Sequence, residues 1–175
     1  MDVSDRDIRI RDAGADDCPQ LAAWWNDGAV MAHAGFPRGL GTTPEQIWAG
    51  IRSDTDDTRR RLIIEYERKP IGECSFRRLE DASAEIGIKI CDPAYQERVL
   101  GRRALSLLID ALFSLGCEKI VLDTNLRNTR AQHVYELLGF RRVGVRYDCW
   151  TDQLGIPQSA VDYALTRADF HSYLP

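Results

Sequence analysis

The stretch that decides the fold is residues 84–104, AEIGIKICDPAYQERVLGRRA. From Glu85 to Cys91, isoleucine occupies every second position, which is the pattern of a strand with one buried face. An Asp-Pro pair ends this strand. From Arg102, apolar residues recur at steps of three and four, which predicts a helix that ends near Gly116. The turn between the two therefore lies at a helix N-terminus.

This turn, residues 96–101 (QERVLG), has the features of an anion site. Free backbone N–H groups and the positive end of the helix dipole favour negative charge at a helix N-terminus. Arg98, Arg102 and Arg103 add positive charge in a chain whose formal net charge is −4. A solvated basic helix start has the same features, so the turn alone leaves both interpretations open.

A second motif lies at residues 128–140, NTRAQHVYELLGF. Asn128 and Gly139 predict the N-cap and the C-cap of a helix. Asn128, Ala131 and Tyr135 follow at steps of three and four, so they share one stripe of that helix. The stripe has the composition of a face packed against an extended polar ligand. The alternative is that Asn128 only caps the helix and Tyr135 only packs.

Together the two motifs resemble the signatures of the GNAT superfamily of acyl-CoA-dependent N-acyltransferases. Gln96 and Gly101 match the Gln/Arg-x-x-Gly-x-Gly/Ala pyrophosphate loop, in which Val99 replaces the first glycine. The second signature, N-x-x-A-x-x-x-Y-E-x-x-G-F, is present in full from Asn128 to Phe140. The early helix and the tail look like the branch that contains ribosomal-protein N-terminal acetyltransferases.

The resemblance implies one α+β domain over residues 1–175. Its GNAT fold has a mixed, mostly antiparallel central sheet of about seven strands, splayed in the middle and flanked by about four helices. The splay would lie between residues 85–91 and 120–123. Alternating patterns predict strands at 7–11, 61–66, 69–77, 84–91, 118–123, 141–150 and 160–166, with Val143 and Val145 inward. Periodic patterns predict helices after Asp17, after Thr43, over 102–115 and over 128–138, with a loop at 28–43.

For the cofactor, the resemblance implies acetyl-CoA as the acyl donor and no metal. The pantetheine arm would bond to the backbone near Ile88 and Ile90, and the N–H groups of the turn would bind the pyrophosphate. A backbone N–H near Ile90 or Cys91 would polarise the thioester carbonyl. The predicted cofactor-binding residues are Ile88, Ile90, Cys91, Gln96, Arg98, Val99, Leu100, Gly101, Arg102, Arg103, Asn128 and Ala131.

Acyl transfer to an amine needs a base, a polarised carbonyl and an acid for the departing thiolate. The resemblance implies that Tyr135 is the general acid. A phenol is suited to that role because its pKa of about 10 keeps it protonated at pH 7. Glu85 is the first candidate for the base and Glu73 the second, although both are equally interpretable as exposed strand carboxylates. A covalent route through Cys91 lacks a histidine at a recognisable spacing.

Composition and cysteine spacing disfavour several classes of protein. With 44% apolar and 29% charged residues, the chain is typical of soluble globular proteins. Five widely spaced cysteines, without a C-x-x-C pair, indicate neither a disulfide framework nor a zinc site. We expect no nucleic-acid partner, no membrane segment and a cytoplasmic location. The expected partner is an amine acceptor, and a homodimer through the closing hairpin stays open.

Two function hypotheses follow. The first is an acetyl-CoA-dependent N-acetyltransferase that acts on a protein N-terminus or a small amine. The second is a catalytically weak GNAT-fold module that binds acyl-CoA for regulation or assembly. Val99 and the unassigned base favour the second, whereas Asn128 and Tyr135 favour the first. A dinucleotide-binding enzyme is set aside, because no G-x-G-x-x-G follows a first strand.

Overall fold

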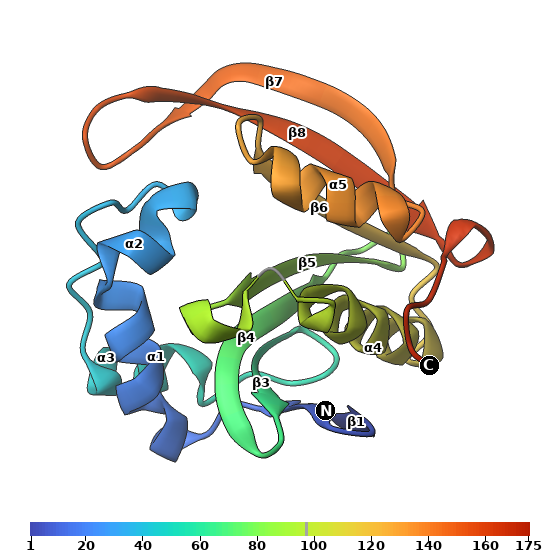
Figure 1. The fold of residues 1–175 in the computed structure, drawn as a ribbon, viewed down its shortest axis with the longest axis horizontal. Helices are drawn as coiled ribbons and strands as arrows, with labels where there is room; N and C mark the ends of the chain where they lie inside the picture. The colour runs from blue at the N-terminus through green and yellow to red at the C-terminus, as the bar shows by residue number, and fades with distance from the viewer. Residues whose placement is uncertain (97) are drawn as a thin grey trace.

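The computed structural model describes residues 1–96 and 98–175, which fold around a mixed sheet (Figure 1). Within these residues the sheet has eight strands in the order β1-β2-β3-β4-β5-β6-β8-β7. The strands are β1 (Asp2–Asp5), β2 (Ile8–Asp12), β3 (Arg59–Tyr66), β4 (Lys69–Arg78), β5 (Ser83–Ile90), β6 (Lys119–Asn125), β7 (Arg141–Thr151) and β8 (Pro157–Thr166). Neighbouring strands are antiparallel except β5 and β6. That parallel pair needs a crossover connection, which a helix supplies.

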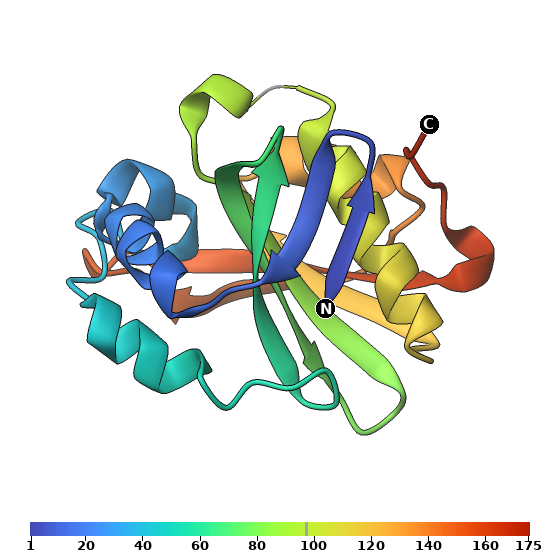
Figure 2. The same cartoon turned by 90° about the horizontal axis from the view of Figure 1, so that it is seen from below.

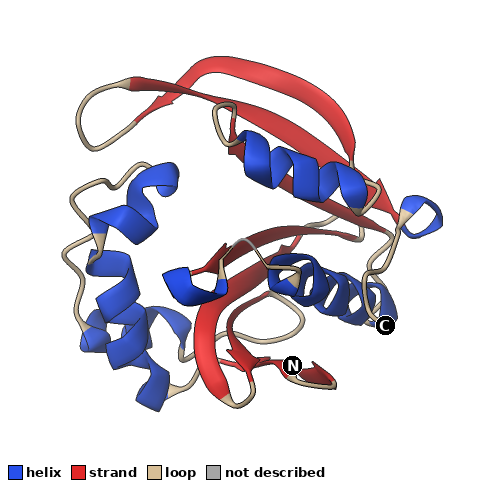
Figure 3. Ribbon diagram, in the orientation of Figure 1, coloured by secondary structure: helices blue, strands red, loops and turns tan. Residues whose placement is uncertain are grey.

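The helices divide into two groups (Figures 2 and 3). They are α1 (Cys18–Asn26), α2 (Gly28–Met31), α3 (Pro44–Ile51), α4 (Leu100–Ser114) and α5 (Thr129–Leu137). The first three lie together at one end of the molecule, apart from α4 and α5. None of the described helices combines the length and the apolar character needed to cross a membrane.

The core has two parts, one on each face of the central strands. In β3, the consecutive residues Leu62, Ile63 and Ile64 are all fully buried, because alternate side chains point to opposite faces and both faces are covered. Leu62 and Ile64 belong to the larger cluster with Leu108 of α4, whereas Ile63 packs with Leu21 of α1. Helices α4 and α5 therefore cover one face, and α1 and α3 cover the other.

The predicted α+β class and the mixed sheet are confirmed, and the predicted elements recur with small shifts at their ends. Two elements were missed. Strand β1 contains no buried residue, and α2 has only four residues, which is too short to show a period. The short helix α2 lies inside the segment that was predicted as a loop.

The prediction for Val143 is wrong. Its side chain is 69% exposed, although Val145 is half-buried as expected. Strand β7 is at the edge of the sheet and pairs only with β8. An alternating pattern on an edge strand does not ensure that its apolar face is covered, because burial depends on neighbours that the pattern does not specify.

Candidate functional site

Strands β5 and β6 separate part-way along their length. They pair from Ser83 and Lys119 to Glu85 and Val121. Beyond that point β5 stays with β4, and β6 stays with β8 as far as Asn125. Figure 1 shows the two halves of the sheet diverging from there. The sheet is therefore splayed where the sequence predicts it, and the opening begins just beyond Glu85.

The backbone of β5 turns polar groups toward this opening. The N–H of Cys91 donates to the carbonyl of Ile71 at 2.9 Å. Since bonded and non-bonded pairs alternate in an antiparallel ladder, the odd-numbered residues of β5 bond to β4. The N–H and C=O groups of Ile86, Ile88 and Ile90 consequently point away from β4, toward the splay.

Two groups that were predicted to contact the cofactor are bonded within the protein, namely the side chain of Gln96 and the N–H of Cys91. Gln96 donates through Nε2 to the carbonyl of Ile90 at 2.9 Å, so this side chain closes the end of β5. The N–H of Cys91 is bonded to β4 and is not free to polarise a carbonyl. Burial also raises the pKa of the Cys91 thiol to about 12, which disfavours the thiolate that a covalent route needs. Among the described residues, no three His, Cys, Asp or Glu side chains form a group able to hold a metal.

The start of α4 has open backbone donors. Val99 is its N-cap residue with a φ of −63°, so this position does not require the conformational freedom of glycine. No side chain caps the helix within the described part of the chain. Among the described residues, no acceptor engages the first N–H groups of α4, at Leu100 and Gly101, so these groups are suited to bind an anion. The predicted turn also includes position 97, which lies outside the described residues.

Arg103 does not face this turn as predicted. Its Nη2 atom forms an ion pair with Asp7 at 2.6 Å and lies 3.4 Å from Asp5. The hydrogen bond to Asp7 raises the pKa of Arg103. Because Asp5 and Asp7 are distant in the sequence, these ion pairs connect α4 to the turn between β1 and β2.

Arg98 and Arg102 are held by aromatic rings instead. The guanidinium of Arg98 lies 5.4 Å from the ring centre of Tyr95, and that of Arg102 lies 4.8 Å from the ring centre of Tyr173. No ion pair engages either guanidinium within the described residues. Cation–π contact leaves the N–H groups at the edge of a guanidinium open, so both residues can still bind phosphate.

Asn128 caps the N-terminus of α5, as predicted. Its Oδ1 atom accepts from the N–H of Ala131 at 3.2 Å, and its Nδ2 atom lies 3.4 Å from Oγ1 of Thr124. The side chain therefore joins α5 to β6 on the far side of the splay. Ala131, on the first turn of α5, is half-buried.

Tyr135 is buried between two other rings. The ring centres of Phe140 and Tyr163 each lie 5.8 Å from its own. Burial raises the pKa of Tyr135 to about 12, and the nearby carboxylate of Asp123 contributes to the rise. The phenol is thus protonated at neutral pH, which is the state that a general acid needs.

The two candidate bases differ in their surroundings. Glu85 lies where β5 still pairs with β6. Its side chain is 45% exposed and forms an ion pair with Arg77 at 2.6 Å. Glu73 is buried. It accepts from Nε1 of Trp25 at 2.8 Å and from Nη1 of Arg61 at 2.7 Å. Its position on β4 is beside the open part of β5.

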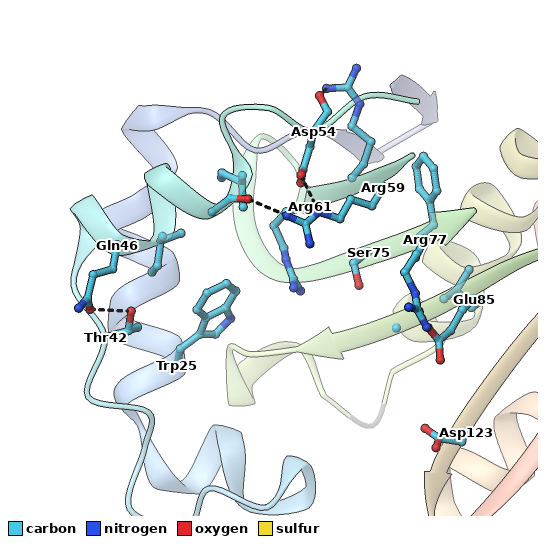
Figure 4. A pocket seen from close by; sticks show the side chains of 17 residues that line it. Trp25, Thr42, Gln46, Asp54, Arg59, Arg61, Ser75, Arg77, Glu85 and Asp123 are labelled. Carbon is cyan, nitrogen blue, oxygen red and sulfur yellow. Dashed lines mark hydrogen bonds and ion pairs between the residues drawn. The ribbon is translucent and has the colours of Figure 1, made fainter. Parts of the chain in front are cut away.

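A cavity of about 510 Å³ lies on this face of the sheet, under α1 and α3 (Figure 4). Trp25, Arg61 and Glu85 line it, together with Asp123 from across the splay. Of these, only Glu85 is among the predicted site residues. Alternation along β3 places Arg61 on the face of Ile63, but the sequence does not show that α1 and α3 leave space there.

Residues 7–141 match the family model described as the acetyltransferase (GNAT) domain. The chain belongs to the GNAT acetyltransferase family. Over 74 residues it is 31% identical to a ribosomal protein bS18-alanine N-acetyltransferase of Haemophilus ducreyi. That match covers 42% of this GNAT chain and 51% of the relative, and a second curated relative is matched over 31% of its length.

Solved structures show the same fold over almost the whole chain. The spermidine N-acetyltransferase of Vibrio cholerae, in complex with CoA and spermine, has a TM-score of 0.81 at 22% identity, covering 93% of this chain and 97% of that one. The ribosomal-protein-S5-alanine acetyltransferase of Vibrio fischeri has a TM-score of 0.80 at 17% identity, covering 98% and 99%. The GNAT fold thus extends beyond the segments in which sequence similarity is detectable.

Proposed function

We propose that this chain is an acetyl-CoA-dependent N-acetyltransferase that moves the acetyl group to a primary amine by direct attack on the thioester. The observation that carries this proposal is the open backbone along the splay at Ile88 and at the N–H of Ile90. An extended pantetheine arm would add to β5 there as an extra strand. The family, and the CoA in the Vibrio cholerae relative, support acetyl-CoA as the donor.

In this proposal the two ends of the cofactor meet different elements. The pyrophosphate binds the N–H groups of Leu100 and Gly101, and Arg98 and Arg102 supply positive charge. The pantetheine arm runs from there along β5. Asn128 and Ala131 border the arm from α5, whereas Gln96 and Arg103 support the loop without contacting the ligand.

The reaction needs one acid and one base. The amine nitrogen attacks the carbonyl carbon while an N–H group of Ile88 or Ile90 polarises the oxygen. As the carbon–sulfur bond breaks, Tyr135 donates its proton to the sulfur. The amine gives its proton to Glu73 through a chain of waters along the cavity. We favour Glu73 over Glu85 because it is beside the open part of β5 and borders the cavity through Trp25 and Arg61.

Calorimetry with acetyl-CoA, followed by a thiol-release assay against a panel of amines, tests this function. We expect saturable binding and amine-dependent thiol release, and the release should fall in Glu73→Gln while binding is kept. Binding without release from any amine would favour the alternative, a catalytically weak acyl-CoA-binding module. No affinity for acetyl-CoA or CoA would reject both functions.

A further inference from the structure

The lining of the cavity under α1 and α3 indicates which amines it accepts. Its floor is a row across three strands, formed by Arg61 of β3, Ser75 of β4 and Gly87 of β5, which pair side by side. Ser75 and Gly87 have small side chains, so they leave space above the sheet. A Cβ on Gly87 would lie 3.3 Å from Oγ of Ser75, so the two residues are closely packed along the floor.

Arg61 is held rigidly at one end of this floor. Its guanidinium lies 4.9 Å from the ring centre of Trp25, and Nη1 donates to Oε2 of Glu73 at 2.7 Å. Its other N–H groups have no acceptor within the described residues, and Figure 4 shows Arg61 between Trp25 and Ser75 at the cavity. A fixed planar guanidinium with open donors is suited to bind a carboxylate through two hydrogen bonds.

The other arginines on this face of the cavity are already satisfied by the protein. Arg59 donates to Asp54 at 3.0 Å and to the carbonyl of Gly50 at 3.1 Å. Arg77 donates to Glu85 at 2.6 Å. Arg59 and Arg77 each use two nitrogens for these bonds, whereas Arg61 uses only Nη1 for its carboxylate partner, Glu73. The remaining donors of Arg61 are therefore the feature that an acceptor would meet.

Two carboxylates line the opposite end of the cavity, and each is paired with an arginine. Glu85 and Asp123 line it where β5 and β6 part, and Arg146 holds Asp123 in place at 2.5 Å. An amine at this end would lie where β5 and β6 part, beside the proposed path of the pantetheine arm.

We propose, on the basis of the proposed acetyltransferase function, that the acceptor is an amine that also carries a carboxylate, with the carboxylate on Arg61 and the amine at the β5–β6 seam. Arg61 and Gly87 are two strand spacings apart, about 10 Å. The side chain of Arg61 extends over part of this distance. The remaining gap suits an acceptor whose carboxylate is only a few bonds from its amine. Peptides with an acidic first residue meet this requirement, whereas polyamines do not.

Isosteric peptide pairs test this inference. Glutamyl-alanine amide and glutaminyl-alanine amide have the same α-amine and differ only in the carboxylate. We expect kcat/KM to favour the glutamyl peptide at least about tenfold, the size of one charge-assisted pair. In Arg61→Gln the preference should fall to within about twofold, and Arg61→Lys should restore part of it. Arg59→Gln, the matched control, should keep the full preference, since Arg59 is satisfied by Asp54 and Gly50.

Calorimetry of the same peptides on the CoA-bound protein gives a readout that is independent of turnover. A preference for the glutaminyl peptide or for spermidine, or a preference that Arg61→Gln leaves unchanged, would overturn the inference. Equal kcat/KM for the two peptides with normal acetyl-CoA binding would overturn the acceptor class alone. Failure to bind acetyl-CoA or CoA would instead reject the acetyltransferase function. Thermal unfolding of each variant checks that the fold is kept.

Discussion

The proposed role of Tyr135 depends on the neighbours that hold its ring. The ring is packed between Phe140 and Tyr163, so its position is set by apolar contacts. Replacement of Tyr135 by Phe removes only the hydroxyl. We expect kcat to fall by about a hundredfold or more, because the thiolate then leaves without a proton donor. Steady-state kinetics and calorimetry together check this, and an equal loss of acetyl-CoA affinity would contradict the acid role.

The same burial predicts how stability depends on pH. The folded pKa of Tyr135 is raised to about 12, above the unfolded value of about 10. Between these values the folded state holds a proton that the unfolded state has lost. This contribution is complete below pH 10 and declines as the pH rises toward 12, at about 1.4 kcal/mol per pH unit. Urea unfolding of the native protein and of Tyr135→Phe from pH 9 to 11 measures it, and the native protein should lose stability more steeply.

Helix α5 ends where its sequence predicts, and the stop has a steric reason. Gly139 has a φ of +96°, and a Cβ there would lie 1.9 Å from the carbonyl oxygen of Asp169. Gly139→Ala should lower the free energy of unfolding by more than about 2 kcal/mol, since neither the backbone nor the neighbouring carbonyl can relax cheaply. Gly50→Ala in α3 is the matched control. No atom lies within 4 Å of its added Cβ, and we expect it to stabilise by up to about 1 kcal/mol. Equal effects in urea unfolding would refute the steric explanation.

For strand β7, the alternating pattern predicts the strand but not which of its side chains are buried. Its alternation predicts an inward Val143, yet that side chain is mostly exposed. The same pattern on β8 is accurate, because Val161, Tyr163 and Leu165 are buried. The two strands differ in position: β8 lies between β6 and β7, whereas β7 is at the edge. Alternation identifies a strand, but only its neighbours determine what covers each face.

Across the whole molecule, the C-terminal segment connects parts that are distant in sequence. The N–H of His171 donates to the carbonyl of Leu138 at 3.0 Å, and that of Tyr173 donates to Oγ of Ser106 at 2.9 Å. The ring of Tyr173 then supports Arg102 at the start of α4. The end of the chain thus positions a side chain of the proposed phosphate site.

Substitution of Tyr173 tests this connection. Tyr173→Leu should weaken acetyl-CoA binding about threefold, the value of one exposed cation–π contact, because Arg102 loses its support. Tyr173→Phe should bind normally. Acetyl-pantetheine lacks the phosphates, so its affinity should be the same in all three proteins. A parallel loss for acetyl-pantetheine in calorimetry would indicate general unfolding of the site rather than loss of the Arg102 contact.

Local patterns determined much of this protein. Isoleucine at every second position of β5, the periodic leucines of α4, and the Asn128 and Gly139 caps depend on residues close in the chain, and for that reason these elements were predictable. The α+β GNAT class was implied by the resemblance of the two motifs to the family's signatures, and the family match confirms it.

Tertiary structure alone decided which of these residues share a site. The pairing of Arg103 with Asp7, the contact of Arg102 with Tyr173, and the cavity floor at Arg61, Ser75 and Gly87 join segments that are far apart in the sequence. A periodic pattern specifies the face on which a side chain lies, because it reflects local backbone geometry. The charge or ring that meets this face depends on how the whole chain packs, which no local spacing contains.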